Sequence, residues 1–536
     1  MLDTNLFDIR RPGNRPLRIE ERLRPDAVFD LTWLVQCRVK ILIVTDGSGG
    51  FSDTTGFHLG QIINILADDP WGHIRFEVTK AHREESGEEG VLDNFRFDAH
   101  DLKQYSQIWL FGITRKTGAL SSSELRALSE FMDDEKGGVF ATGDHENLGE
   151  AMSAEIPRVR SMRRWHYPNT GPNGEPIAPD RNGIKSHDTI VNFGMGGTQT
   201  DPEPQTISPV LYTRTLSAGP ILNQVVRYPH PLLCGPNGVI NYLPDHMHEG
   251  WCEVPKDLSK SWTFESKTFT EYRTKNGHQQ RPEVIAYADN NHSNRQFGVI
   301  AAYDGHRVDV GRVVVDSTWH HWFNINTLPY INASNPAHPS YTPATVQKWE
   351  EIKAYYRNVA VWLARPTLQR CIRNGGWLRT LGDYDVIITA QNLEQVTDLS
   401  LYYWQLGTFA LDALGRGATQ CQTIQWVLDI LYPIEFEPRL PFPVDPWIQL
   451  PPDNRPEAPP RSFDVKEFEA IALGAAIHEA RQKFGQVKNP QALLDTDDGA
   501  ELEEVLRGGV SHGINVYANQ MEESFNMGQR LLSQMR

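Results

Sequence analysis

The stretch Val39–Asp46, VKILIVTD, decides the fold class. It is a continuous apolar run that ends in an acid and is followed by the glycine-rich DGSGG, which is typical of a buried parallel strand that runs into a loop. Helical and strand-like patterns then alternate: FHLGQIINILADD, IRFEVTK, SQIWLFG, SSSELRALSEFMDDEKGG and GGVFATGDHENLG. Strands that alternate with helices predict βαβ units. We therefore expect an α/β protein with a doubly wound, mainly parallel, flavodoxin-like sheet.

The strand rhythm stops after this region and later returns. Residues 154–282 are rich in Pro, Gly, Asn and His, which predicts elaborated loops with short strands. The runs PEVIAYAD, FGVIAAYDG and GRVVVDSTWHHW then restore the sheet. The predicted organisation is an N-terminal arm, an α/β domain, helices that complete the body, a proline-rich linker and a helical C-terminal domain, over residues 1–36, 37–330, 331–431, 432–462 and 463–536.

The C-terminal segment carries an apolar stripe at helical spacing, which consists of Ile514, Tyr517, Met521, Phe525, Leu532 and Met535. Such a stripe must be covered, either by the body of its own chain or by the tail of another protomer. A homo-oligomer held together through residues 463–536 is therefore one expectation.

The composition disfavours several kinds of partner. The formal net charge of −16 repels nucleic-acid backbones and anionic lipid surfaces in general. No run of about 18 uncharged apolar residues predicts a membrane span, and the first residues do not resemble a secretory signal. A small polar molecule is the expected partner.

Five cysteines are scattered along the chain without a C-x-x-C pair: Cys37, Cys234, Cys252, Cys371 and Cys421. Their odd number and spacing argue against a disulfide framework and against a thiolate zinc site. We therefore expect a reduced protein in the cytoplasm.

The residues that follow the strands are the first candidates for a site, because ligands of open α/β sheets bind at the carboxyl ends of the strands. Asp46 follows the first strand, Asp144, His145 and Glu146 follow the strand GVFAT, and His320 comes after RVVVDST. Carboxylates and imidazoles are the usual general acids and bases, and we take these five residues as the catalytic candidates. The structural alternative is that Asp144 caps a helix whose first turn contains Glu146.

A second polar cluster lies in the segment LPDHMHEGW. It offers Asp245, His246, His248 and Glu249 as ligands for a divalent transition metal such as zinc. In an extended segment the two histidines would point the same way. The spacing is not that of a helical H-E-x-x-H motif, and loop histidines often serve only as hydrogen-bonding residues.

Three further residues are candidates for substrate binding. Arg163 and Arg164 belong to an arginine group that could hold a phosphate or carboxylate, or could pair with acids of the protein itself. Trp319, beside His320, could be a core residue or a platform on which a sugar ring stacks.

The order of elements, the turn TGDHENLG after a central strand and the histidine after the last strand resemble the class I glutamine amidotransferase-like superfamily, in particular its ThuA-like (trehalose-utilisation-like) branch. The resemblance covers about residues 38–330. Catalytic members of that superfamily carry a G-x-C-x-G nucleophile elbow at this turn and a histidine after the late strand. Residues 142–146 read TGDHE, so the cysteine is absent, while His320 or His321 matches the late histidine. The resemblance implies a related fold without glutamine amidotransferase activity.

Two functions are compatible with these patterns. The leading hypothesis is a metal-assisted hydrolase, or a related enzyme, that acts on a small polar substrate for which a carbohydrate is one candidate. The alternative is a catalytically inactive binding or assembly module that oligomerises through its C-terminal helices, which the missing cysteine favours.

Overall fold

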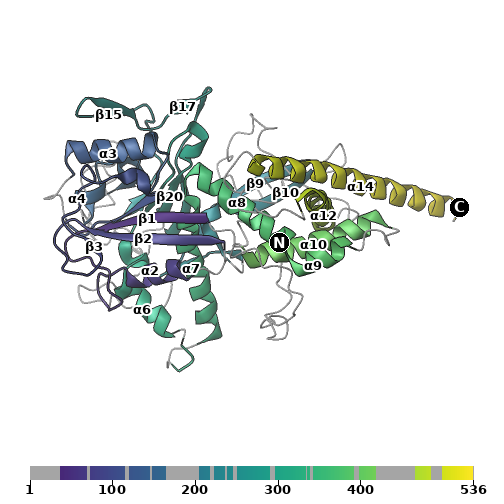
Figure 1. The fold of residues 1–536 in the computed structure, drawn as a ribbon, viewed down its shortest axis with the longest axis horizontal. Helices are drawn as coiled ribbons and strands as arrows, with labels where there is room; N and C mark the ends of the chain where they lie inside the picture. The colour runs from purple at the N-terminus through teal and green to yellow at the C-terminus, as the bar shows by residue number, and fades with distance from the viewer. Residues whose placement is uncertain are drawn as a thin grey trace.

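The computed structural model describes residues 37–68, 73–114, 120–144, 148–164, 205–217, 223–235, 238–244, 250–289, 296–333, 335–337, 342–391, 398–417, 465–484 and 498–534. An α/β body lies at one side of the molecule and a group of helices at the other, and the C-terminal helix projects from this group (Figure 1).

One mixed sheet organises the body. Its parallel part has the spatial order β3, β2, β1, β4, β5 and β21. These strands span Val91–Leu92, Ile74–His82, Cys37–Thr45, Gln107–Phe111, Gly138–Thr142 and Val313–Asp316. Antiparallel strands continue the sheet beyond β21: β20 (Gln296–Tyr303), β14 (Trp251–Cys252) and β6 (Arg163–Arg164), while β19 (Glu283–Asp289) pairs with β20 and β8 (Ser208–Pro209) pairs with β19. The predicted α/β class is confirmed.

The first strand shows why this sequence builds a sheet that is covered on both faces. Side chains alternate along a strand, so Ile41 and Ile43 of β1 enter one apolar core while Leu42 and Val44 enter another. Helices α2 and α7 contribute to the first core and helix α3 to the second. The helices of the body are α2 (Gly60–Ala67), α3 (Ser122–Asp133), α4 (Glu150–Ser153), α5 (Val159–Met162), α6 (Asn324–Ala333) and α7 (Pro343–Trp362). Burial on both faces explains the continuous apolar run in β1.

Short hairpins occupy the described parts of the region in which short strands were expected. The longest joins β9 (Leu211–Ser217) to β10 (Asn223–Pro229). Other hairpins pair β11 (Cys234–Gly235) with β12 (Gly238–Val239), β15 (Ser261–Phe264) with β16 (Lys267–Thr270), and β17 (Thr274–Lys275) with β18 (His278–Gln279). In addition, β7 (Gln205–Thr206) pairs antiparallel with β13 (Tyr242–Leu243), which lies further along the chain. The single-turn 3-10 helices are η3 (Leu102–Gln104), η6 (Pro231–Leu233), η7 (Gly305–Val308) and η8 (Trp319–His321).

The remaining helices form a layer of their own beside the body. They are α8 (Pro366–Leu381), α9 (Tyr384–Gln391), α10 (Leu399–Gly417), α12 (Val465–Phe484) and α14 (Asp498–Gln534). Helix α12 packs between α10 and α14. A Cβ added to Gly407 of α10 would lie 1.8 Å from the carbonyl oxygen of Ala470 in α12, so the two backbones approach closely. The predicted linker 432–462 lies outside the described residues, and helices from both sides of it pack together.

The predicted tail stripe is covered in part by its own chain. Tyr517 of α14 is buried, and Ile514 and Met521 are partly buried against the core. The side chains of Phe525 and Leu532, and all of Met535, lie outside the described part of the structure. Among the described helices, none is long and apolar enough to cross a membrane.

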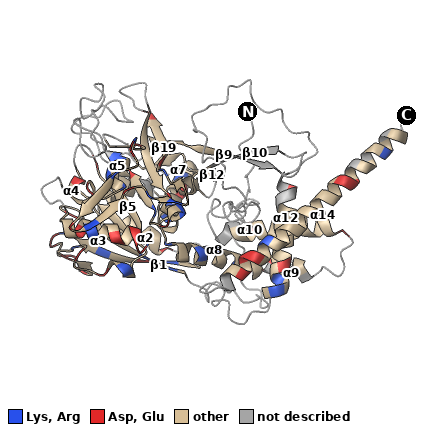
Figure 2. Cartoon of the chain, turned by 90° about the horizontal axis from the view of Figure 1, so that it is seen from above, with Lys and Arg blue, Asp and Glu red and all other residues tan. Residues whose placement is uncertain are grey.

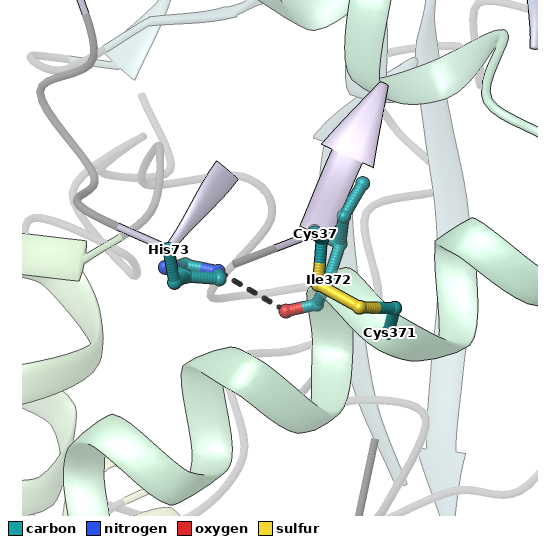
Figure 3. Close-up of a disulfide and its surroundings, with 4 residues drawn as sticks. All are labelled: Cys37, His73, Cys371 and Ile372. Atoms are coloured by element: carbon teal, nitrogen blue, oxygen red, sulfur yellow. Dashed lines mark hydrogen bonds between the residues drawn. A yellow bond between two sulfur atoms is a disulfide. The ribbon is translucent and has the colours of Figure 1, made fainter. Parts of the chain in front are cut away.

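A disulfide joins the sheet to the helical layer, and the expectation of a protein without disulfides was wrong. Cys37, the first residue of β1, is bonded to Cys371 of α8, with their Cα atoms 5.9 Å apart (Figure 3). Beside it, Nε2 of His73 lies 3.1 Å from the carbonyl oxygen of Ile372. Cys234 is disulfide-bonded as well. The pairing was missed because 334 residues separate Cys37 from Cys371 and only the fold brings them together. It removes the cysteine argument for a cytoplasmic location.

Candidate active site

The carboxyl edge of the parallel strands gathers the candidates that lie within the described residues. Strands β1, β4, β5 and β21 run in the same direction. Asp46 directly follows β1, Asp144 follows β5 by two residues, and His320 follows β21 by four. The three side chains therefore extend from one edge of the sheet, as the strand pattern predicts.

Asp144 and His320 meet at this edge. Nε2 of His320 lies 3.5 Å from Oδ2 of Asp144, and each side chain is only 1% exposed. Thr318 supports both residues, because its hydroxyl donates to Oδ1 of Asp144 at 3.1 Å and accepts the backbone N–H of His320 at 3.2 Å. Asn326 of α6 holds the other side of the ring, with its amide nitrogen 3.1 Å from Nδ1 of His320. The pairing of β5 with β21 brings the two turns together.

Asp144, His320 and Asn326 form a row with the imidazole in the middle. In catalytic triads a nucleophile contacts one ring nitrogen of a histidine while a third side chain orients the other. Here a carboxylate, Asp144, occupies the first position and Asn326 the third. The amide nitrogen of Asn326 can only donate, so Nδ1 of His320 accepts and the ring proton lies on Nε2, which faces Asp144.

Arg163 joins the two turns that carry this pair. Its side chain is fully buried at 0% exposure. Its guanidinium donates to the carbonyl oxygens of Asp316 at 2.9 Å, Ser317 at 2.6 Å and Asp144 at 3.2 Å. Burial lowers the pKa of Arg163 to about 10, so the side chain stays charged at neutral pH. In this position Arg163 holds the turns after β5 and β21 together.

Gly250 allows its own segment to lie close to Arg163 and to the carbonyl oxygen of Ser317. A Cβ at this position would lie 1.9 Å from the carbonyl oxygen of Ser317 and 2.5 Å from Nη2 of Arg163. Backbone cannot yield at such a distance, so a glycine is required where this segment crosses the site.

Asp316, at the end of β21, anchors the turn that carries His320. Its carboxylate is fully buried and accepts hydrogen bonds from Nδ1 of His321 at 2.9 Å, Nε1 of Trp322 at 3.1 Å and the hydroxyl of Tyr355 at 3.3 Å. Burial and the nearby carboxylate raise the pKa of Tyr355 well above its usual value, so this hydroxyl remains a donor. The turn after β21 is thus held by the hydrogen bonds to the Asp316 carboxylate as well as by Arg163.

Asp46 is engaged elsewhere on the same edge. Its Oδ1 accepts the backbone N–H groups of Ile113 at 2.6 Å and Thr114 at 3.0 Å, and the Thr114 hydroxyl donates to its other oxygen. Burial raises the pKa of Asp46 despite these donors. Strand β4 separates β1 from β5, and Asp46 ties the ends of β1 and β4 together.

Trp319 lies in the core. Its side chain is 3% exposed, and its ring packs against Phe57 at 5.4 Å and Phe323 at 5.7 Å between centroids. Its Nε1, together with Oγ of Ser317 and Nε2 of His321, has no hydrogen-bond partner among the described residues. The turn after β21 therefore keeps buried polar atoms that a water or a ligand could satisfy.

The other predicted site residues cannot be placed. His145, Glu146, Asp245, His246, His248 and Glu249 lie outside the described residues, as does the side chain of Arg164. Within the described ranges, no group of three or more His, Cys, Asp or Glu side chains is arranged to hold a metal ion.

Sequence reasoning did not select Thr318, Asp316 or Asn326, which support the pair. Thr318 could have been found as a capping residue directly before a short helical turn, since threonine is favoured there. Asp316 is an acidic residue at the end of a strand, and Asp46 was selected because it is an acidic residue in the same kind of position. Asn326 carried no local signal, because its role depends on how α6 returns to the sheet.

Neither a scan against protein-family models nor a search of curated proteins finds a match for this chain. The resemblance to the amidotransferase-like superfamily therefore rests on element order, the turn after β5 and the late histidine.

Proposed function

We propose that this protein is a hydrolase-type enzyme that uses Asp144 and His320 as its acid/base pair on a small polar substrate. The observation that carries the proposal is the 3.5 Å contact between the two buried side chains at the carboxyl ends of adjacent parallel strands. A buried carboxylate and imidazole in contact are costly unless they are paired and held, and here Thr318, Asn326 and Arg163 hold them.

The pair can move protons in both directions that hydrolysis requires. In the proposed step, the Asp144 carboxylate takes a proton from the attacking water while the Nε2–H of His320 faces it and stabilises its charge. Protonated Asp144 then gives this proton to the leaving group, which restores the carboxylate. Asn326 keeps the ring in the orientation that directs this N–H towards Asp144.

The strand order supports the family assignment that we also propose. The long parallel strands run β2-β1-β4-β5-β21, which corresponds to the order 2-1-3-4-5 of flavodoxin-like sheets. In a ThuA-like protein Asp144 would stand at the elbow in place of the cysteine, which fits general acid/base chemistry and not thioester formation. A carbohydrate remains the first substrate class to test, although the buried ring of Trp319 offers no stacking surface in this structure.

A role for a metal ion stays part of the proposal through Asp245, His246, His248 and Glu249. Metal analysis of the purified full chain tests it. If these residues bind an ion, the protein should retain about one transition-metal ion per chain, and the double change His246→Ala and His248→Ala should release it.

The acid/base proposal is tested by hydrolysis of p-nitrophenyl esters and p-nitrophenyl glycosides by the full-length chain. With the best substrate of the panel, Asp144→Asn and His320→Gln should each lower kcat by roughly 10²- to 10⁴-fold, because the first removes the proton carrier and the second the N–H that stabilises its charge. The pH profile of kcat/KM should lose a limb in Asp144→Asn.

His82→Gln is the matched control. His82 is also a buried histidine at the carboxyl edge, but its Nδ1 accepts the backbone N–H of Glu84 at 3.0 Å. This variant should keep the activity of the parent. Hydrolysis that is undetectable across the panel, or that survives loss of Asp144 and His320, would count against the proposal.

A further inference from the structure

Helix α14 changes character along its length. As far as Met521 it carries buried or partly buried side chains that pack on the rest of the chain, whereas all described side chains from Glu522 to Gln534 are exposed. Figure 2 shows this end of the helix projecting away from α12 and the other helices. A helical segment as short as Glu522 to Gln534 is marginal in water on its own, so this projecting end is expected to gain stability from a partner.

Among its described side chains, the projecting end carries an apolar face. Met527 is 63% exposed and Leu531 55% exposed, and they are four residues apart. Residues at this spacing lie one above the other on a helix. Large apolar side chains with this exposure are unfavourable in water and typical of a contact surface.

Charges flank this face in a self-complementary arrangement. Glu523 precedes Met527 by four residues, and Arg530 follows it by three, so all three share one side of the helix. Both charged side chains are exposed, and neither forms an ion pair with any residue that the structure describes. Figure 2 shows acidic and basic bands following one another along the projecting end.

We propose that this face, defined by Glu523, Met527, Arg530 and Leu531, binds the same face of a second copy of the chain in antiparallel orientation. An antiparallel pairing centred between Asn526 and Met527 places Glu523 of each copy beside Arg530 of the other, and the apolar side chains lie in between. A two-fold contact of this kind is closed and yields a dimer. A parallel pairing would place like charges together. The inference is independent of the proposed catalytic function.

The contact is small, which sets its expected strength. Two helix ends of about three turns bury less surface than the roughly 1,200–2,000 Å² of a standard stable interface. The dimer should therefore be concentration-dependent and in rapid exchange with the monomer.

The experiment is analytical ultracentrifugation of the full-length protein from low to high micromolar concentration. The parent should pass from monomer to dimer, and the double change Met527→Glu and Leu531→Glu should leave it monomeric throughout. Circular dichroism confirms that each variant is folded, which is expected because the face lies outside the core.

Charge exchange tests the orientation. Glu523→Arg and Arg530→Glu should each raise the dimer dissociation constant by about tenfold, because two-fold symmetry breaks two ion pairs at once. The combination of both changes should restore the parent value to within about twofold. Glu522→Arg is the matched control: the same change of charge one residue away, on another side of the helix, should have little effect.

A parent that stays monomeric at every concentration would overturn the proposal and leave the face to some other partner. So would equal weakening by Glu522→Arg and Glu523→Arg, or failure of the double exchange to restore association.

Discussion

The two edges of the central sheet are held together by different forces. At the carboxyl edge, buried Asp46 joins the end of β1 to the turn after β4, and buried Arg163 donates to carbonyl oxygens of the turns after β5 and β21. At the amino edge, Cys37 is bonded covalently to α8 and His73 contacts the same helix. A covalent and apolar junction stabilises the fold without placing reactive groups. The buried charged groups at the carboxyl edge carry a desolvation cost. Such a cost is expected where a reaction depends on buried charge.

The largest effect is expected from breaking the carboxyl edge at Arg163. Arg163→Met removes the buried donors to the carbonyl oxygens of Asp144, Ser317 and Asp316, and it removes a positive charge that lies near the buried carboxylates of Asp144 and Asp316. We expect a loss of roughly 3–5 kcal/mol in the free energy of unfolding, measured by urea denaturation. Any folded fraction should have lost hydrolysis, because the Asp144–His320 contact is no longer held.

Arg163→Lys is the informative companion. A lysine keeps the charge but cannot reproduce the planar fork that reaches all three carbonyls. It should recover part of the stability and less of the activity. Parent-like stability of Arg163→Met would show that the clamp is not what joins the two turns.

A smaller effect is expected from breaking the amino edge. Cys37→Ala with Cys371→Ala removes the constraint on a loop of 334 residues in the unfolded chain, and should cost about 2–4 kcal/mol of stability. Activity per folded molecule should be unchanged, because the disulfide lies at the opposite edge from Asp144 and His320.

The free cysteine Cys252 provides the control for the loss of sulfur, since Cys252→Ala removes no disulfide. Mass spectrometry of the parent, alkylated without reduction, should find Cys37 and Cys371 unmodified. If removal of the disulfide lowers activity in step with stability, the two edges are coupled and the contrast drawn above fails.

The smallest effect concerns Asp46. Its folded-state pKa is raised by burial, so the stability that it contributes is fully present below the unfolded pKa of 3.8 and is lost as the pH rises through the folded pKa. Asp46→Asn should therefore flatten the decline in stability above pH 3.8 and slightly favour the fold at neutral pH. Urea denaturation across this pH range measures it, and a variant that is less stable at neutral pH would show that the hydrogen bonds from Ile113 and Thr114 outweigh burial.

Several elements could be predicted from local pattern alone. The run Val39–Asp46 is apolar on both sides, and it is a strand buried between two cores. The stretch SSSELRALSEFMDDEKGG was predicted as a helix, and it forms α3, whose start Ser121 and Glu124 fix with a reciprocal capping box. These predictions succeed because periodicity and capping depend on neighbours in sequence.

The candidate site was predicted only in part. Asp144 and His320 were selected because they follow strands, and strand ends meet at one edge when the strands are parallel. Their partners Asn326 and Arg163 reach the pair from other elements, and no local pattern specified that Arg163 would bind carbonyl oxygens of its own chain.

The sequence by itself determined the α/β class, the position of the main strands and the edge at which Asp46, Asp144 and His320 lie, because hydrophobic periodicity and strand direction are local properties. Only the tertiary structure decided which of these side chains touch, that Asp46 closes β1 onto β4, that Trp319 belongs to the core, and that Cys37 is bonded to Cys371. Those outcomes depend on distances between residues far apart in the chain, which side-chain packing and burial set once the elements assemble.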